Sequence, residues 1–128
     1  MRKLTIGDIA QRAGVSTSAI RYYEQEGLLP EPPRESGQRR YSADVLPRLR
    51  LIRSLRDGGF TIADLRVMLR DFPDDAPAPP RWQALSRHKL ADINAQIQQL
   101  QRMKQLLVHV QDCACADLDV CAESMNAN

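Results

Sequence analysis

Three cysteines crowded into nine residues offer the most distinctive chemistry in this sequence. Cys113, Cys115 and Cys121 are its only cysteines. Cys-x-Cys spacing lets two thiolates hold one ion, and the five residues after Cys115 return a third sulfur to it. A secreted disulfide framework would instead spread an even number of cysteines along the chain. The pattern therefore predicts a site for a thiophilic metal ion, or a redox site, in a reducing compartment.

Two neighbouring side chains also have ligand chemistry. His109 lies four residues before Cys113, and Met125 lies four residues after Cys121. A histidine on the last turn of a helix is more often a surface or packing residue, and Met125 falls in a tail. The predicted metal ligands are therefore the three cysteines, with His109 left open.

Charge divides the chain of 128 residues into two unlike halves. Residues 1–70 hold 13 Lys and Arg against 8 acidic residues, whereas the remaining 58 hold 5 against 8. A basic half of this kind indicates a polyanionic partner such as nucleic acid.

The basic half also has the pattern of a winged helix-turn-helix. Apolar residues at helical spacing predict a helix over 5–13, capped by Thr5, and a second helix opens at Ser16 and ends by Gly27. Prolines 30, 32 and 33 exclude a helix interior, and Ser36-Gly37 predicts a turn between two short strands that display arginines. Further amphipathic helices are expected after Ser42 and after Thr61, and each of these two residues is the expected N-cap of its helix.

A long segment near the C-terminus predicts one extended helix. Residues 81–111 contain neither Gly nor Pro. Apolar residues recur at steps of three and four, with Lys104 in the one missing position, at Leu90, Ile93, Ile97, Leu100 and Leu107. One helix cannot bury its own apolar stripe, so a helix pair between two copies of the chain is favoured over packing against its own N-terminal domain.

Several motifs together resemble the MerR family of bacterial transcription regulators. They include Arg21-Tyr22-Tyr23-Glu24, Gly27-Leu28, Arg39-Arg40-Tyr41 and Gly59-Phe60, in the order and spacing of that family. The resemblance implies a homodimer that binds double-stranded promoter DNA and, when its ligand is bound, distorts that DNA so that RNA polymerase can start transcription. The DNA contacts that it implies are Ser16, Thr17, Arg21, Tyr23, Arg34, Arg39, Arg40 and Tyr41.

The resemblance leaves two branches open for the cysteines. Cys113 and Cys121 resemble the two-cysteine clamp of the copper-sensing CueR branch, with Cys115 added, and zinc or another soft or borderline ion is also expected to fit. Sensors of divalent ions in the family usually have a further cysteine at the start of the long helix, which this chain lacks. The alternative is a redox-responsive activator of the SoxR type, but its two-iron two-sulfur cluster needs a fourth cysteine where this chain has Val110.

The expected fold is mainly α. The predicted organisation is a winged helix-turn-helix domain with two connecting helices over 1–75, a Pro-rich linker over 76–80, a dimerisation helix over 81–111, and an effector-binding cysteine loop and tail over 112–128. No Gly-rich phosphate loop or hydrolase arrangement is present, so an enzyme is not expected. The absence of a long apolar run or a signal segment favours a cytoplasmic protein without a membrane span.

Overall fold

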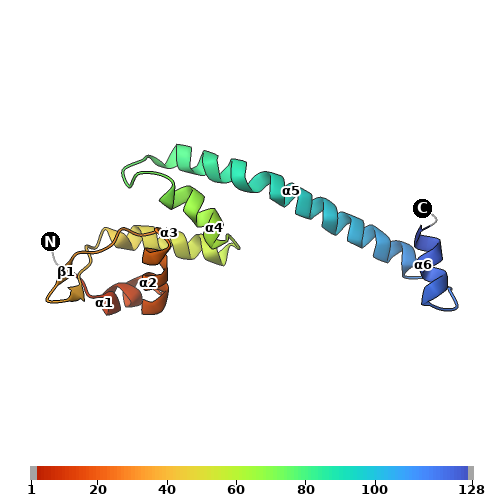
Figure 1. Ribbon diagram of the computed structural model, residues 1–128, viewed down its shortest axis with the longest axis horizontal. Helices are drawn as coiled ribbons and strands as arrows, with labels where there is room; N and C mark the ends of the chain where they lie inside the picture. The colour runs from red at the N-terminus through yellow and green to blue at the C-terminus, as the bar shows by residue number, and fades with distance from the viewer. Residues whose placement is uncertain (1–2, 127–128) are drawn as a thin grey trace. The chain divides into compact units, whose positions relative to one another are not determined.

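The computed structural model describes residues 3–126, and it is mainly helical, as predicted. Residues 1–2 and 127–128, the ends of the first and last predicted segments, lie outside the described residues. The chain forms two compact units, Met1–Leu90 and Ala91–Asn128, and helix α5 contributes to both (Figure 1). Among the described residues, no helix combines the length and apolar character that a membrane crossing demands.

The predicted helix-turn-helix is confirmed in α1 (Ile6–Ala13) and α2 (Thr17–Gln25). The Thr5 hydroxyl accepts a hydrogen bond from the Asp8 backbone N–H at 3.1 Å, and the Asp8 carboxylate accepts one from the Thr5 N–H. Gly14 ends α1 at φ 70°, and a Cβ there would lie 2.2 Å from the Arg53 guanidinium. The left-handed backbone at this position favours glycine, and an added Cβ would also displace the flexible end of Arg53.

The predicted wing is a two-residue hairpin. Strands β1 (Arg34–Glu35) and β2 (Gln38–Arg39) are antiparallel, with Arg34 opposite Arg39. Ser36 at φ 53° and Gly37 at φ 79° both take the left-handed conformation, as a tight primed hairpin turn requires. A backbone bridge between Leu4 and Tyr41 then joins the end of the wing to the start of the chain.

Helix α3 (Val45–Asp57) begins later than predicted. Asp44 is its N-cap residue, and the Ser42 hydroxyl instead accepts a hydrogen bond from the Asp44 N–H at 3.2 Å. Ser42 therefore stabilises the turn before the helix, and the prediction that it caps α3 was wrong. Pro47 lies in the first turn of α3, where a missing N–H costs nothing.

Thr61 caps α4 (Ile62–Leu65), as predicted, and forms a second capping box with Asp64. The helix then widens into the π-helical segment η1 (Arg66–Arg70), which the apolar spacing did not predict. The core that these elements enclose is aliphatic, with its largest fully buried side chains at Ile9, Ile20, Leu28, Leu49, Ile52, Leu65 and Met68.

Helix α5 (Ala78–Val110) starts inside the predicted linker. Pro79 and Pro80 belong to its first turn, because proline has no backbone N–H to lose there and its fixed φ suits a helix. Leu85 on this helix packs into the core of the first unit.

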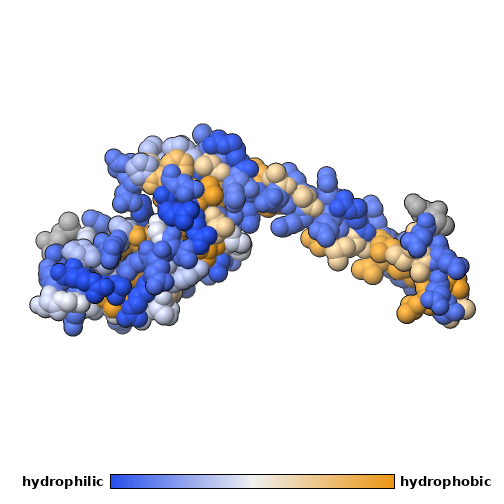
Figure 2. All heavy atoms as spheres, in the orientation of Figure 1, coloured by the Kyte–Doolittle hydropathy of each residue, from blue (hydrophilic) through white to orange (hydrophobic). Residues whose placement is uncertain are grey.

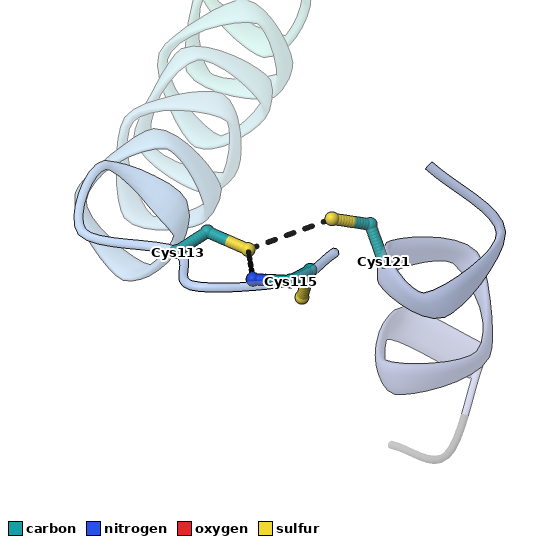
Figure 3. A group of neighbouring side chains, drawn as sticks. All are labelled: Cys113, Cys115 and Cys121. Atoms are coloured by element: carbon teal, nitrogen blue, oxygen red, sulfur yellow. Dashed lines mark hydrogen bonds between the residues drawn. The ribbon is translucent and has the colours of Figure 1, made fainter. Parts of the chain in front are cut away.

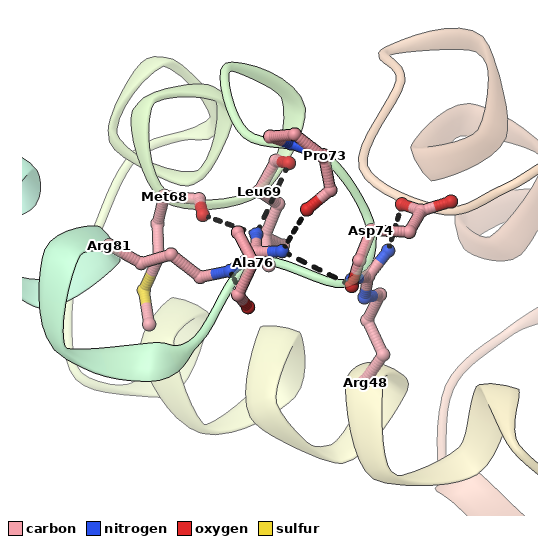
Figure 4. A network of polar contacts seen from close by, with 7 residues as sticks. All are labelled: Arg48, Met68, Leu69, Pro73, Asp74, Ala76 and Arg81. Carbon is pink, nitrogen blue, oxygen red and sulfur yellow. Dashed lines mark hydrogen bonds and ion pairs between the residues drawn. The ribbon is translucent and has the colours of Figure 1, made fainter.

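Arg81 holds the start of α5 against the end of η1. Arg81 is 5% exposed, and its guanidinium lies 5.5 Å from the centre of the Phe72 ring. Figure 4 shows Arg81 among the backbone carbonyls that surround it. Its nitrogens donate hydrogen bonds to the backbone carbonyls of Met68, Leu69, Pro73, Asp74 and Ala76, at 2.5–3.4 Å. One buried side chain therefore satisfies five carbonyls at the end of η1 and in the connection to α5.

A buried ion pair makes a second connection to α5. The Lys89 ammonium lies 2.7 Å from the carboxylate of Asp64, whose side chain is almost fully buried. Burial raises the pKa of Asp64, but the hydrogen bonds from Lys89 and Thr61 outweigh it and leave that pKa below its ordinary value. The ionised carboxylate thus caps α4 and holds α5 at once.

The second unit contains a helix that the sequence reading missed. After α5 ends, the chain turns and forms α6 (Leu118–Asn126), where only a loop and tail were expected. Figure 2 shows apolar side chains gathered on part of the surface of this unit, toward the end of α5 and α6, among hydrophilic ones. The exposed ones are Ile97, Leu100, Met103, Leu106, Leu107, Val108, Leu118, Val120 and Met125.

Arg81→Lys should lower the free energy of unfolding by about 2–4 kcal/mol, because a lysine ammonium has too few donors for all the carbonyls and leaves some unsatisfied. Urea titration followed by circular dichroism measures the change. Arg87→Lys is the matched control, since Arg87 is exposed on the same helix. Equal stability of the two variants would contradict the role assigned to Arg81.

Candidate metal centre and nucleic-acid interface

The three thiols converge at one point of the second unit. Cys113 follows the end of α5, Cys115 lies in the connection, and Cys121 lies on α6. All three sulfur atoms are within 4.8 Å of one another, and the cysteines are free rather than disulfide-bonded (Figure 3). The structure therefore brings the predicted metal ligands together.

Local hydrogen bonds set this geometry. The Cys113 N–H donates to the Val110 carbonyl at 3.0 Å, which turns the chain sharply at the end of α5. The Asp117 carboxylate accepts a hydrogen bond from the Val120 N–H at 3.0 Å, and the Asp117 carbonyl accepts one from the Cys121 N–H. Asp117 thus begins α6 as an N-cap does, and α6 carries Cys121 back toward the other two sulfurs.

The thiols differ in acidity because they interact. Hydrogen bonding from the Cys115 thiol, the Cys115 N–H at 3.3 Å and the Cys121 thiol lowers the pKa of Cys113. The hydrogen bond with the Cys113 thiol, and to a smaller extent the one with the Cys121 thiol, raises the pKa of Cys115 to about 12. A cation that binds all three sulfurs must therefore displace the Cys115 proton.

The cysteines open into a cavity of about 390 Å³. His109 and Met125 also line this cavity, so both stand near the thiols without belonging to the close sulfur cluster. Ligation by either residue stays a hypothesis.

The arginines predicted to contact DNA gather in the first unit. Arg21 on α2 lines one hollow together with Arg34 and Arg39 of the wing. Arg34 donates to the Gly37 carbonyl at 3.2 Å, and Arg40 donates to the Gln38 side chain at 3.3 Å. A hollow lined by three arginines suits a phosphate.

Two further residues predicted to contact DNA, Ser16 and Thr17, lie at the start of α2. Ser16 is its exposed N-cap, whose hydroxyl accepts the Ala19 N–H at 3.0 Å, and Thr17 is half-buried in its first turn. The backbone N–H groups at this helix start give the first unit a second place suited to an anion.

Glu24 is a residue that sequence reasoning missed as a site component. Its side chain is 7% exposed, accepts the Arg39 Nε–H at 3.0 Å and accepts the Tyr41 hydroxyl. Burial, together with Glu24, raises the pKa of Tyr41. Glu24 therefore fastens the wing to α2, a role visible only once the wing is folded against that helix.

Two of the predicted DNA contacts are buried. Tyr41 is 2% exposed and Tyr23 is 9% exposed, whereas Tyr22 beside it is 43% exposed. Both buried rings pack in the core of the first unit. DNA contact by Tyr23 and Tyr41 stays a prediction, and their burial favours a supporting role instead.

Two family models match this chain. Residues 4–71 match the MerR HTH family regulatory protein model, and residues 46–110 match the model described as MerR, DNA binding. The chain belongs to the MerR family. The predicted recognition is confirmed, and the two matches together span the helix-turn-helix, the wing and α5.

Named relatives and solved structures agree with this membership. The MerR-family chain is 36% identical to the mercuric resistance operon regulatory protein of Serratia marcescens, over 84% of its own length and 74% of that protein. It is similar to the transcription regulator PbrR691 of Ralstonia metallidurans in complex with lead(II), at TM-score 0.69 and 28% identity, covering 89% and 90% of the two chains. It also resembles HiNmlR, a MerR family regulator bound to promoter DNA, at TM-score 0.56 and 25% identity, covering 87% and 89%.

Tyr41→Phe should lower the free energy of unfolding by about 1–2 kcal/mol, because it removes one donor from the buried Glu24 carboxylate. Thermal unfolding of the MerR-family chain measures this loss. Tyr22→Phe serves as the control, since an exposed hydroxyl contributes little. If both variants unfold at the wild-type temperature, Glu24 does not hold the wing through Tyr41.

Proposed function

We propose that this chain is a transcription regulator that binds promoter DNA with its first unit and a thiophilic metal ion with its second. One observation carries the proposal: three free thiols lie within 4.8 Å of one another in a MerR-family chain. The mercuric resistance regulator and the lead(II) complex among its relatives support a soft-metal ligand. A regulator of this kind acts by binding rather than by turnover, and we place it in the cytoplasm.

The DNA contacts proposed for the first unit divide by what each group can do. Arg21, Arg34 and Arg39 line one hollow, and we assign them with Arg40 chiefly to phosphates, which position the protein on the duplex. Ser16 and Thr17 lie at the start of α2 and would add backbone and hydroxyl donors. Tyr23 and Tyr41 would hold α2 and the wing in place from the core.

The apolar stripe on α5 supports a homodimer. Leu90, Ile97, Leu100 and Leu107 are 47–64% exposed in the single chain, which is a costly arrangement for large aliphatic side chains. Their spacing is that of a helix pair, so a second α5 would cover them.

Regulation requires that the ion favour one of two states of the dimer. Cys113 follows the end of α5, Cys115 lies in the connection and Cys121 lies on α6, so an ion bridging them would fix α6 against the end of α5. In the proposed mechanism the ion-bound dimer distorts promoter DNA, and RNA polymerase then starts transcription.

A redox sensor is the second candidate, and one distance favours it. Cys113 Sγ and Cys121 Sγ are 3.5 Å apart, close enough that a small movement would allow a disulfide between them. A two-iron two-sulfur cluster is less well supported, because it needs four ligands and the sequence holds three cysteines.

Cys113→Ser or Cys121→Ser should abolish metal-dependent induction but keep DNA affinity within about threefold, because the thiols and the arginine hollow belong to different units. A transcription reporter measures induction, and binding to duplexes selected from a random library measures affinity. A mutant that is still fully inducible by metal would refute the site. Wild-type induction by peroxide alone, without metal, would favour the redox candidate.

Arg21→Ala should weaken binding to every duplex and reduce the slope of log affinity against log salt by about 1, as expected for one lost phosphate contact. Fluorescence anisotropy at several salt concentrations gives this slope. Arg102→Ala, an exposed arginine on the later part of α5, should leave it unchanged. An unaltered slope for Arg21→Ala would remove Arg21 from the interface.

A further inference from the structure

We propose that each protomer binds one divalent thiophilic cation with its own Cys113, Cys115 and Cys121, and that Cys115 selects such ions over monovalent ions that take two thiolates. This inference rests on the proposed metal-binding function. It adds the class of ion, the number of sulfur ligands and the number of ions per dimer.

The ligand set is complete within one chain. No cysteine occurs outside residues 113–121, so the start of α5, which carries Arg81 and Trp82, has no thiol to offer a partner's site. The loop and α6 already bring all three sulfurs of one chain within 4.8 Å. A second protomer is therefore not needed to supply a thiolate.

The sulfur separations fit three ligands better than two. With metal–sulfur bonds of about 2.3 Å, sulfurs around one ion lie roughly 3.8–4.0 Å apart in tetrahedral or trigonal geometry and roughly 4.6 Å apart in linear geometry. The Cys113–Cys121 sulfur distance is 3.5 Å, and Cys115 completes a triangle with no separation beyond 4.8 Å. Linear binding by Cys113 and Cys121 would have to open that pair by about 1 Å and leave Cys115 beside the ion unused.

The segment around the thiols is acidic. Residues 111–128 contain Asp112, Asp117, Asp119 and Glu123, and they contain no lysine or arginine. Three thiolates add further negative charge when an ion binds. The electrostatic attraction from this segment is twice as large for a divalent cation as for a monovalent one at the same position. The dehydration cost of a divalent ion is also larger, so the sulfur geometry carries the choice of ion class and the acidic segment adds attraction to it.

Native mass spectrometry of the reduced, full-length dimer, titrated anaerobically with cadmium(II), tests the stoichiometry. Two ions per dimer are expected. One ion per dimer would overturn this inference and leave the proposed function intact, because a site shared between protomers still senses metal. Failure to bind cadmium(II), zinc(II), mercury(II) and copper(I) alike would overturn the proposed function itself.

Cys115→Ser tests the selectivity. Cadmium(II) affinity should fall by at least about 100-fold with the loss of one thiolate bond, and copper(I) affinity should stay within about tenfold. Competition with chromogenic chelators measures both affinities, and the cadmium–thiolate absorbance should fall by about one third. Ala114→Ser, a hydroxyl introduced next to the site, should change neither affinity. A variant that keeps wild-type cadmium(II) affinity, or that loses both ions equally, would overturn the role of Cys115.

Discussion

The burial of the Arg81 guanidinium is the constraint on which the arrangement of the first unit depends. A helix that follows another through a short, proline-rich connection leaves carbonyl groups without partners at the point where the chain must be packed. Arg81 satisfies five of them while its charge faces the Phe72 ring. Together with the Asp64–Lys89 ion pair, it makes the start of α5 part of the same folded core as the helix-turn-helix. The start of α5 is therefore held firmly to the rest of the first unit.

Glu24 anchors the wing to α2, as Arg81 anchors the start of α5 to the end of η1. A hairpin of two-residue strands has too few backbone hydrogen bonds to hold its own position. The buried carboxylate supplies the missing connection, since it binds Arg39 and Tyr41 from a helix that is itself part of the core. The wing and α2 consequently present Arg21, Arg34 and Arg39 in one hollow. The buried Glu24 carboxylate thus fixes the surface that we propose to contact phosphates.

The sequence predicted most of the elements, because capping residues and apolar spacing are local signals. Thr5, Ser16 and Thr61 cap helices where predicted, and the arginine-bearing hairpin turns at Ser36-Gly37. The failures were of another kind. Ser42 stabilises the turn before α3, and Pro79 and Pro80 belong to the first turn of α5, because proline is compatible with a helix start. The roles of Glu24 and Arg81 depend on partners distant in sequence or on backbone geometry, which residue types alone do not reveal. The cysteines were predictable from spacing, whereas the helix that carries Cys121 was not.

The sulfur cluster draws its members from nine consecutive residues, and this has a consequence for how it assembles. Its contacts span short sequence separations, so little chain entropy is lost in closing them, and closure needs no prior folding of the distant helix-turn-helix. The sulfur positions are therefore set by the end of α5, the connection and α6 alone. If one chain supplies all the ligands, as proposed, an ion can enter and leave the cluster without separation of the two protomers.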